Sequence, residues 1–186
     1  MKDFPVLETE RLILHRLEFR DAERVRTLAN QREIAMMVTP MPHPYTLQHA
    51  QDWIAMTRAA IEMKTGFPFG IWLKAEEKLI GAMEIGNEMR HRRGELGYWL
   101  GKAFWGQGYT TEAAYSVLRF TFETLGLNRV FATHYARNPA SGRVMQKIGM
   151  TYEGTLRGHV VKWGEPIDLL YYSILRAEYD QAKNSL

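Results

Sequence analysis

The sequence contains no cysteine among its 186 residues. This absence excludes disulfide bonds, thiolate ligands for a metal ion and a cysteine nucleophile. A chain without thiols is compatible with a reducing compartment, and we expect the protein to be cytoplasmic. The six histidines show no His-Glu-x-x-His spacing, so the sequence has no helical zinc motif and we expect no metal site.

Long apolar runs are also missing. No segment approaches the roughly 18 apolar residues of a membrane span, and Met1–Pro5 lacks the apolar core of a signal peptide. We therefore expect no membrane partner.

The net charge of +3 is small and the basic residues are scattered, with His91–Arg93 as the densest cluster. A nucleic-acid-binding face needs concentrated positive charge, so we expect no nucleic-acid partner, whereas a mildly basic surface suits an anionic small molecule.

Two common catalytic motifs are absent as well. No Gly-Lys pair is followed by Ser or Thr, as a P-loop requires. Ser141 has Pro139 and Arg143 on either side, so it lacks the flanking glycines of a nucleophile elbow. The sequence therefore gives no basis for hydrolysis by a serine or for metal catalysis.

The composition that remains is ordinary for a globular protein, with 46% hydrophobic and 24% charged residues. We expect one domain spanning residues 1–186, large enough to bury roughly 70% of its unfolded surface. Apolar spacing predicts an α/β (α+β) fold: a mixed sheet of seven strands with helices on both faces. The expected strands are residues 12–17, 67–73, 79–85, 94–100, 129–135, 151–163 and 166–175, with a turn at Gly164–Glu165; the expected helices are residues 21–30, one capped by Thr46, one ending before Gly126 and one from Asn138 to Gly149.

The other elements are organised around one stretch, Phe104–Ala113, with the sequence FWGQGYTTEA. A strand-like run ending at Leu100 precedes it, and helical apolar spacing follows it. A strand that leads through a glycine-containing loop into a helix is a phosphate-binding arrangement, because free backbone N–H groups and the positive end of the helix dipole point at the loop. Gly106 and Gly108 let the backbone approach a ligand closely, since neither has a Cβ.

Spacing separates the loop families that fit this pattern. A dinucleotide-binding fingerprint needs a third glycine where Thr111 stands and an acidic residue where Asn128 stands. The acyl-CoA loop of the GNAT superfamily usually has the pattern Gln/Arg-x-x-Gly-x-Gly/Ala. Trp105, Gly108 and Thr110 fall on its three marked positions, and only the central glycine matches strictly. A strand-to-helix turn that binds no ligand is the alternative.

Further motifs occur in order along almost the whole chain: Glu8–Leu12, Glu95–Leu100, Phe104–Tyr109, Asn138-x-x-Ser141, Lys147–Met150 and Glu153-Gly154-x-Leu156-Arg157. With these motifs the chain resembles the ribosomal-protein N-terminal (RimJ/RimL-like) acetyltransferase branch of the GNAT superfamily. The resemblance implies the GNAT fold, a mostly antiparallel sheet that splays open at its centre. It also implies acetyl-CoA as cosubstrate.

The resemblance places the cosubstrate against particular residues. Its pantetheine arm is expected in the opened sheet beside Tyr98, Trp99 and Leu100, with a backbone N–H of Trp99 or Leu100 facing the acetyl carbonyl. Its diphosphate is expected on the backbone amides of the glycine loop. The residues expected to bind the diphosphate are Gln107, Gly108, Tyr109, Thr110 and Thr111.

The helix that begins near Asn138 is expected to contribute on its first turns. By the resemblance, Ser141 is the candidate to hydrogen-bond the departing thiolate, and a simple helix cap is the competing role. Asn138 is expected to bind the pantetheine arm or to shape the turn. Arg143 and Lys147 are expected to meet phosphates of the cosubstrate, although an exposed helix face explains them almost as well.

The general base is not identified by the resemblance. Many relatives have a glutamate where Thr133 stands and a tyrosine where Met145 stands, and both departures weaken a borrowed mechanism. Glu84 interrupts an apolar run, so we select it as the candidate base; an exposed strand residue is the alternative. Glu95 and His134 have a structural role as their simpler interpretation.

These observations predict an acetyl-CoA-dependent N-acetyltransferase that transfers acetyl directly to a primary amine. A protein N-terminus, such as that of a ribosomal protein, is the expected acceptor. A small amine metabolite or antibiotic is the alternative acceptor, and a non-catalytic acetyl-CoA-binding module is the alternative function. A homodimer is left open by the sequence.

Overall fold

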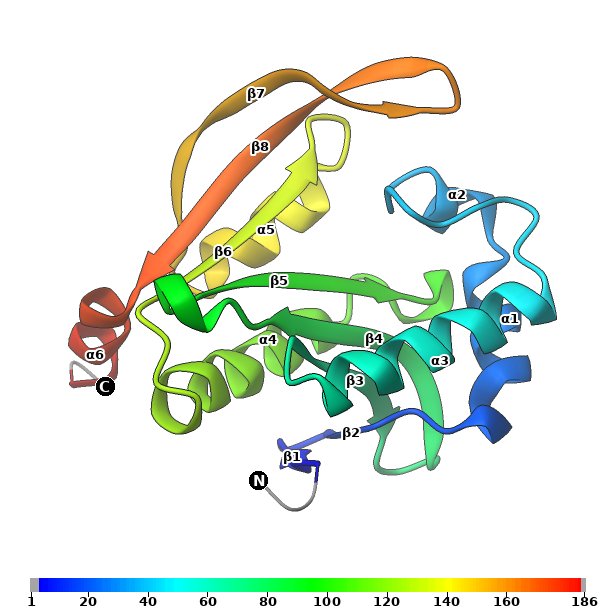
Figure 1. Cartoon of the computed structure of the whole chain (residues 1–186), viewed down its shortest axis with the longest axis horizontal. Coiled ribbons are helices and arrows are strands. Elements are labelled where there is room, and N and C mark those ends of the chain that lie inside the picture. The colour runs from blue at the N-terminus through cyan, green and yellow to red at the C-terminus, as the bar shows by residue number, and fades with distance from the viewer. Residues whose placement is uncertain (1–3, 185–186) are drawn as a thin grey trace.

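The computed structural model describes residues 4–184, and its centre is one eight-stranded sheet (Figure 1). The strands lie in the order β1-β2-β3-β4-β5-β6-β8-β7. Neighbouring strands are antiparallel except β5 and β6, which are parallel. The predicted mixed sheet is therefore confirmed. The strands are β1 (Leu7–Glu8), β2 (Leu12–His15), β3 (Gly66–Leu73), β4 (Lys78–Gly86), β5 (Arg93–Leu100), β6 (Arg129–Tyr135), β7 (Thr151–Lys162) and β8 (Glu165–Leu175).

Helices cover both faces of this sheet, as the apolar spacing predicts (Figure 1). α1 and α3 pack on one face of β3 and β4, whereas α4 and α5 pack on the other face of the sheet. Within residues 4–184, no helix combines the length and the apolar character needed to cross a membrane. The helices are α1 (Ala22–Ala29), α2 (Arg32–Ala35), α3 (Leu47–Glu62), α4 (Tyr109–Arg119, extended by a π-helical turn at Phe120–Thr124), α5 (Pro139–Lys147) and α6 (Arg176–Asn184).

Local sequence sets several helix ends. Thr46 caps α3, because its side-chain oxygen accepts a hydrogen bond from the backbone N–H of His49 at 3.2 Å. Gly149 follows α5 with φ +84, a left-handed conformation that favours glycine. Gly126, with φ +68, lies just after the π-helical turn that extends α4. These three predicted boundaries are confirmed.

The structure differs from the sequence-based expectation in four places, the first being the short helix α2, which was not expected. The sheet has an eighth strand, β1, whose two residues are too few for an alternating pattern to be recognised. α6 was not expected, and none of its residues is buried; Tyr179 fixes it by stacking on Phe122 with ring centroids 4.8 Å apart. The last hairpin turns at Trp163 and Gly164, with φ +53 and +86, one residue earlier than expected.

The sheet opens between β5 and β6. These strands pair only at Arg93–Glu95 with Arg129–Phe131. Beyond that point β5 stays paired with β4 as far as Leu100, and β6 stays paired with β8 as far as Tyr135. The two halves of the sheet consequently diverge, as Figure 1 shows. Among residues 4–184, the edge of β5 that faces β6 has no strand partner over residues 96–100, and the predicted splay is confirmed.

The far end of this opening is bridged by side chains. Lys162, which is only 5% exposed, donates hydrogen bonds to the carbonyls of Val38 (2.8 Å), Thr39 (3.1 Å) and Met41 (2.6 Å). The hydroxyl of Tyr135 at the end of β6 donates to Oγ1 of Thr39 at 2.9 Å. These bonds join the β7–β8 hairpin and β6 to the segment between α2 and α3, so the two diverging halves are held at a fixed separation.

Candidate active site

A glycine loop connects β5 to α4 beside the opening. Gly106 and Gly108 have φ of +74 and +81, and Gly108 is the N-cap residue of α4. The indole N–H of Trp105 donates to the carbonyl of Leu100 at 2.8 Å, which ties the loop back to the end of β5. The left-handed conformation at both glycines turns the chain sharply enough to direct the loop backbone outward.

The backbone N–H groups from Gln107 to Thr111 donate no hydrogen bond within residues 4–184. The first backbone bond of α4 runs from the N–H of Glu112 to the carbonyl of Gly108 at 3.0 Å, and Gly108 has no side chain to cap the helix. Unpaired amides at the positive end of a helix dipole form a binding site for an anion. The fold thus brings the five residues expected to bind a diphosphate into one continuous row.

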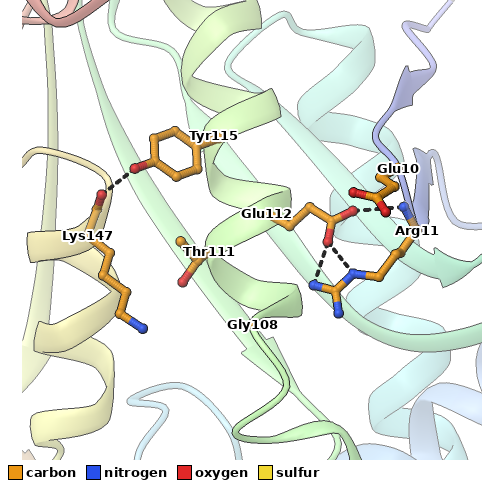
Figure 2. A pocket seen from close by; sticks show the side chains of 7 residues that line it. All are labelled: Glu10, Arg11, Gly108, Thr111, Glu112, Tyr115 and Lys147. Carbon is orange, nitrogen blue, oxygen red and sulfur yellow. Dashed lines mark hydrogen bonds and ion pairs between the residues drawn. The ribbon is translucent and has the colours of Figure 1, made fainter. Parts of the chain in front are cut away.

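An open cavity of about 560 Å³ adjoins this first turn of α4. In Figure 2 the cationic ends of Arg11 and Lys147 lie on opposite sides of the turn. Lys147 is held through its main chain, since the hydroxyl of Tyr115 donates to its carbonyl, and its ammonium has no partner among residues 4–184. The charge of Arg11 is paired with Glu112, so the free amides and the unpaired ammonium of Lys147 are the groups of this cavity that suit an anionic ligand. Its lining residues are Glu10, Arg11, Gly108, Thr111, Glu112, Tyr115 and Lys147.

Tyr98 on β5 meets Ser141 on α5 across the opening. The Tyr98 hydroxyl donates to the Ser141 carbonyl at 3.1 Å and lies 2.9 Å from the Ser141 Oγ. Burial raises the pKa of Tyr98 to about 12, against a smaller lowering by the bond with Ser141, so the phenol stays protonated at neutral pH. Because its one proton goes to the carbonyl, the Ser141 hydroxyl is the donor in the second bond.

The first turn of α5 places the other predicted residues. Oδ1 of Asn138 accepts from the backbone N–H of Ser141 at 3.3 Å and caps the helix. The competing role of Ser141 as the cap is therefore wrong, and its hydroxyl points to Tyr98 instead. Arg143 is exposed and has no ion-pair partner among the described residues, so it is free to meet an anion. Met145 is 1% exposed and belongs to the core.

Glu84 and Glu95 lie on the sheet face that α1 and α3 cover. Glu84 pairs with Gly97 of β5, and its Oε1 lies 3.6 Å from the position that a Cβ on Gly97 would occupy. The side chain is exposed, as the alternative expectation had it, and its carboxyl also leans over β5 toward the opening. Although part of the side chain is exposed, the protein around the carboxyl desolvates it; this desolvation, followed by the charge of Glu95, raises the pKa of Glu84. Neither carboxylate has a hydrogen-bond or ion-pair partner within residues 4–184, and burial raises the pKa of Glu95 as well.

The side chains of Trp99, Leu100 and His134 take part in packing. Trp99 packs edge-to-face on Trp53 at 6.0 Å and Leu100 is 4% exposed, so the side chains of these two strand residues belong to the core. His134 is 6% exposed; its Nδ1 lies 2.9 Å from the carbonyl of Tyr135, and its Nε2 has no partner among the described residues. That ring packs against Gly142, where an added Cβ would lie 2.7 Å from Nε2, so it fills the contact between β6 and α5.

Sequence reasoning missed the side-chain contacts that hold the site together. The Tyr98–Ser141 pair spans 43 residues, and an ion pair between Arg11 and Glu112 spans 101 residues. No spacing rule connects positions so far apart. The available signal was Glu8–Leu12, which carries the family resemblance and contains Arg11, but it gives no partner for that residue.

Comparison with known proteins shows the family of the chain. The family model for the acetyltransferase (GNAT) domain matches residues 11–151. The chain is 32% identical over 174 residues to an uncharacterized N-acetyltransferase, YoaA, of Bacillus subtilis, covering 93% of this chain and 98% of YoaA. It is 31% identical over 182 residues to the putative ribosomal N-acetyltransferase YdaF of the same organism, covering 94% and 96% of the two chains.

A solved structure shows the same fold. The microcin C7 self-immunity acetyltransferase MccE, in complex with acetyl-CoA and AMP, superposes with a TM-score of 0.82 at 20% sequence identity. The superposition covers 90% of this chain and 93% of that one. The parted sheet with helices on both faces is therefore an architecture found in solved acetyltransferase structures.

The loop geometry predicts the effect of replacing Gly108 with valine. A β-branched residue at φ +81 is strained, by about 1–2 kcal/mol or more, so the free amides should leave their present alignment. We expect Gly108→Val to weaken acetyl-CoA binding by at least about tenfold in calorimetry. Gly164→Val is the matched control, because Gly164 has φ +86 in the turn between β7 and β8, outside the loop. Equal affinity in the two variants would contradict this assignment.

Proposed function

The chain belongs to the GNAT family of acetyltransferases, and from that membership we propose that it transfers the acetyl group of acetyl-CoA to a protein N-terminal amine, such as that of a ribosomal protein. The family resemblance found in the sequence is thereby confirmed, and the chain is an N-acetyltransferase. The observation that carries the proposal is the row of unpaired amides from Gln107 to Thr111 at the edge of the parted sheet.

The proposed cosubstrate site follows the opening of the sheet. The amides of Gln107–Thr111 receive the diphosphate, and Lys147 and Arg143 supply positive charge for the remaining phosphate. The free edge of β5 at Tyr98–Leu100 pairs with the amides of the pantetheine arm, and Asn138 lies at the end of that path. The structure of MccE, which contains acetyl-CoA, supports this choice of cosubstrate.

The reaction needs few special groups, because the thioester is already activated. The residues must bring amine and thioester together, stabilise the developing oxyanion and assist the leaving thiolate. A backbone N–H of Trp99 or Leu100 takes the oxyanion role in this proposal. One such donor is typically worth about 3 kcal/mol.

Ser141 is proposed to donate a hydrogen bond to the departing thiolate. In the free protein its hydroxyl donates to Tyr98, and rotation about its side-chain bond redirects that proton. A serine hydroxyl is too weakly acidic to protonate a thiolate outright, so its contribution is a charge-assisted hydrogen bond. Tyr98 keeps its own proton on the Ser141 carbonyl throughout, because burial raises its pKa to about 12.

Glu84 is proposed as the general base. A base is most effective when its pKa approaches the working pH, and the raised pKa of Glu84 moves it in that direction. Freeing a lysine amine of pKa about 10.4 at pH 7 costs about 4.6 kcal/mol, whereas an α-amine of pKa about 8 costs about 1.4 kcal/mol. A carboxylate base therefore suits an α-amine better than a lysine side chain.

The similarity to YdaF supports a ribosomal N-terminus as the acceptor. The test is calorimetry with acetyl-CoA, followed by thiol release across a panel of amines. The panel holds N-terminal peptides of ribosomal proteins, the same peptides with blocked α-amines and an internal lysine, and small primary amines. We expect release with free α-amines. Thiol release with small amines alone would show that the acceptor is a small amine and not a protein N-terminus. Binding of acetyl-CoA without thiol release for any amine would contradict the proposed transferase activity.

Replacing Ser141 with alanine should reduce turnover more than cosubstrate affinity. A hydrogen bond to a charged group is worth about 1.5–3 kcal/mol, so kcat should fall by about 10- to 150-fold. The dissociation constant of acetyl-CoA should change by less than about threefold, since the bond forms only as the thiolate leaves. Ser116→Ala is the control, because that buried hydroxyl bonds only within α4, to the carbonyl of Ala113. Equal losses in affinity and turnover would remove the assigned role.

Replacing Glu84 with glutamine should lower kcat by at least about tenfold, since general bases contribute about 10² to 10⁴. In the wild type, kcat should fall on the acid side of a pKa above the ordinary 4.5, and the variant should lose that limb. Glu62→Gln, on the exposed last residue of α3, is the control and should leave the profile unchanged.

The raised pKa of Glu84 also predicts how Glu84→Gln affects the stability of the fold. Because the pKa of Glu84 is higher in the folded than in the unfolded chain, the folded state binds that proton more tightly. Stability therefore falls as pH rises from the unfolded-state pKa through the folded-state pKa. At pH 7 the Glu84→Gln protein should unfold at a temperature no lower than the wild type. A clear loss of stability together with the loss of turnover would point to a structural role.

A further inference from the structure

Arg11, in the turn before β2, holds the first turn of α4 from across the molecule. Its Nε donates to Oε2 of Glu112 at 2.7 Å, and Nη2 lies 2.6 Å from the same oxygen. The backbone N–H of Arg11 donates to Oε1 of Glu112 at 2.9 Å, and the hydroxyl of Thr9 donates to that oxygen at 2.6 Å. Figure 2 shows the Arg11–Glu112 pair beside the cavity. Both oxygens of one carboxylate are thus held by the N-terminal segment.

The same guanidinium also contacts the glycine loop. Nη1 of Arg11 donates to the carbonyl of Gln107 at 3.1 Å, and the guanidinium carbon lies 4.5 Å from the centre of the Tyr109 ring. Its Nη2 lies 3.5 Å from the position a Cβ on Gly108 would take. The carbonyl of Gln107 and the N–H of Gly108 belong to one trans peptide and point in opposite directions, so the Gly108 N–H points away from Arg11 and stays unpaired among residues 4–184.

Glu112 poses an electrostatic problem for an anion site. A carboxylate in the first turn of a helix is stabilised by the helix dipole, but it repels a diphosphate bound at the same turn. Burial alone would raise the pKa of Glu112, whereas the bonds from Thr9 and Arg11 and the charge of Arg11 lower it overall. Its carboxylate is therefore ionised at neutral pH, and its side chain is only 18% exposed, so water screens it poorly. A cation that cancels this charge removes a repulsion that would oppose binding of an anion.

We propose that Arg11 is a positioning residue for the cosubstrate diphosphate: it neutralises Glu112 and holds the Gln107 carbonyl so that the loop amides face the ligand. This inference rests on the proposed use of acetyl-CoA. The segment that carries Arg11 is itself anchored, since Nζ of Lys74 donates to the carbonyl of Thr9 at 2.7 Å and pairs with Glu8 at 3.1 Å. The N-terminal segment thereby fixes the charge and shape of the glycine loop and the first turn of α4. Arg11 and Glu112 are 101 residues apart in the chain.

The test compares the affinities of coenzyme A and of dephospho-coenzyme A, which keeps the diphosphate and lacks the 3′-phosphate, by calorimetry. Four proteins are measured: wild type, Arg11→Met, Glu112→Gln and the double variant. We expect Arg11→Met to weaken both ligands by the same factor, at least about tenfold, because it leaves Glu112 charged beside the diphosphate. Glu112→Gln should keep nearly wild-type affinity, and the double variant should recover to within about fivefold of wild type.

Arg26→Met is the matched control, since Arg26 forms an exposed ion pair with Glu23 and has no contact with the loop. Recovery in the double variant is a readout that simple misfolding would not give. Unchanged affinity in Arg11→Met would overturn the inference. It would also be overturned if the double variant stayed as weak as Arg11→Met, or if only coenzyme A were affected, because Arg11 would then act on the ligand directly. Failure of the wild type to bind either ligand would instead refute the proposed function.

Discussion

The short parallel pairing between β5 and β6 is the constraint on which the site depends. β5 and β6 pair over only three residue pairs. Beyond them β5 stays paired with its antiparallel partner β4, and β6 stays paired with its antiparallel partner β8. The hydrogen-bonding edge of β5 is consequently left for another partner. The bridge that Lys162 forms to the carbonyls between α2 and α3 holds the halves apart, so the opening is a built feature of the fold.

In the proposed cosubstrate site, main-chain groups are expected to bind the diphosphate more than side chains do. Five consecutive amides from Gln107 to Thr111 lack partners in the described part of the chain, and two left-handed glycines direct them outward. Main-chain donors cannot be ionised or rotated away, which keeps them aligned before the ligand arrives. In the same proposal, Lys147 and Arg143 add positive charge, while Arg11 is paired with the carboxylate of Glu112.

Much of the fold was predictable because local signals were strong. Alternating apolar residues located the seven longer strands, and capping by Thr46 and the glycine at Gly149 located helix ends. The misses have physical reasons. β1 is too short to show a period, and α6 buries no residue that would give it an apolar stripe. Met145 stands where many relatives have a tyrosine, and its side chain is buried in the core.

The sequence by itself determined the family, the order of the longer strands and helices and the glycine loop, since each depends on residues that are neighbours along the chain. Only the tertiary structure decided which side chains meet at the site. In the folded chain Asn138 caps α5, and Ser141 forms a hydrogen bond with Tyr98. The Glu84 side chain lies over β5, and Arg11 forms an ion pair with Glu112. Contacts of this kind join residues that are far apart in the chain, and their geometry is set by how the sheet twists and parts. No local pattern records that information.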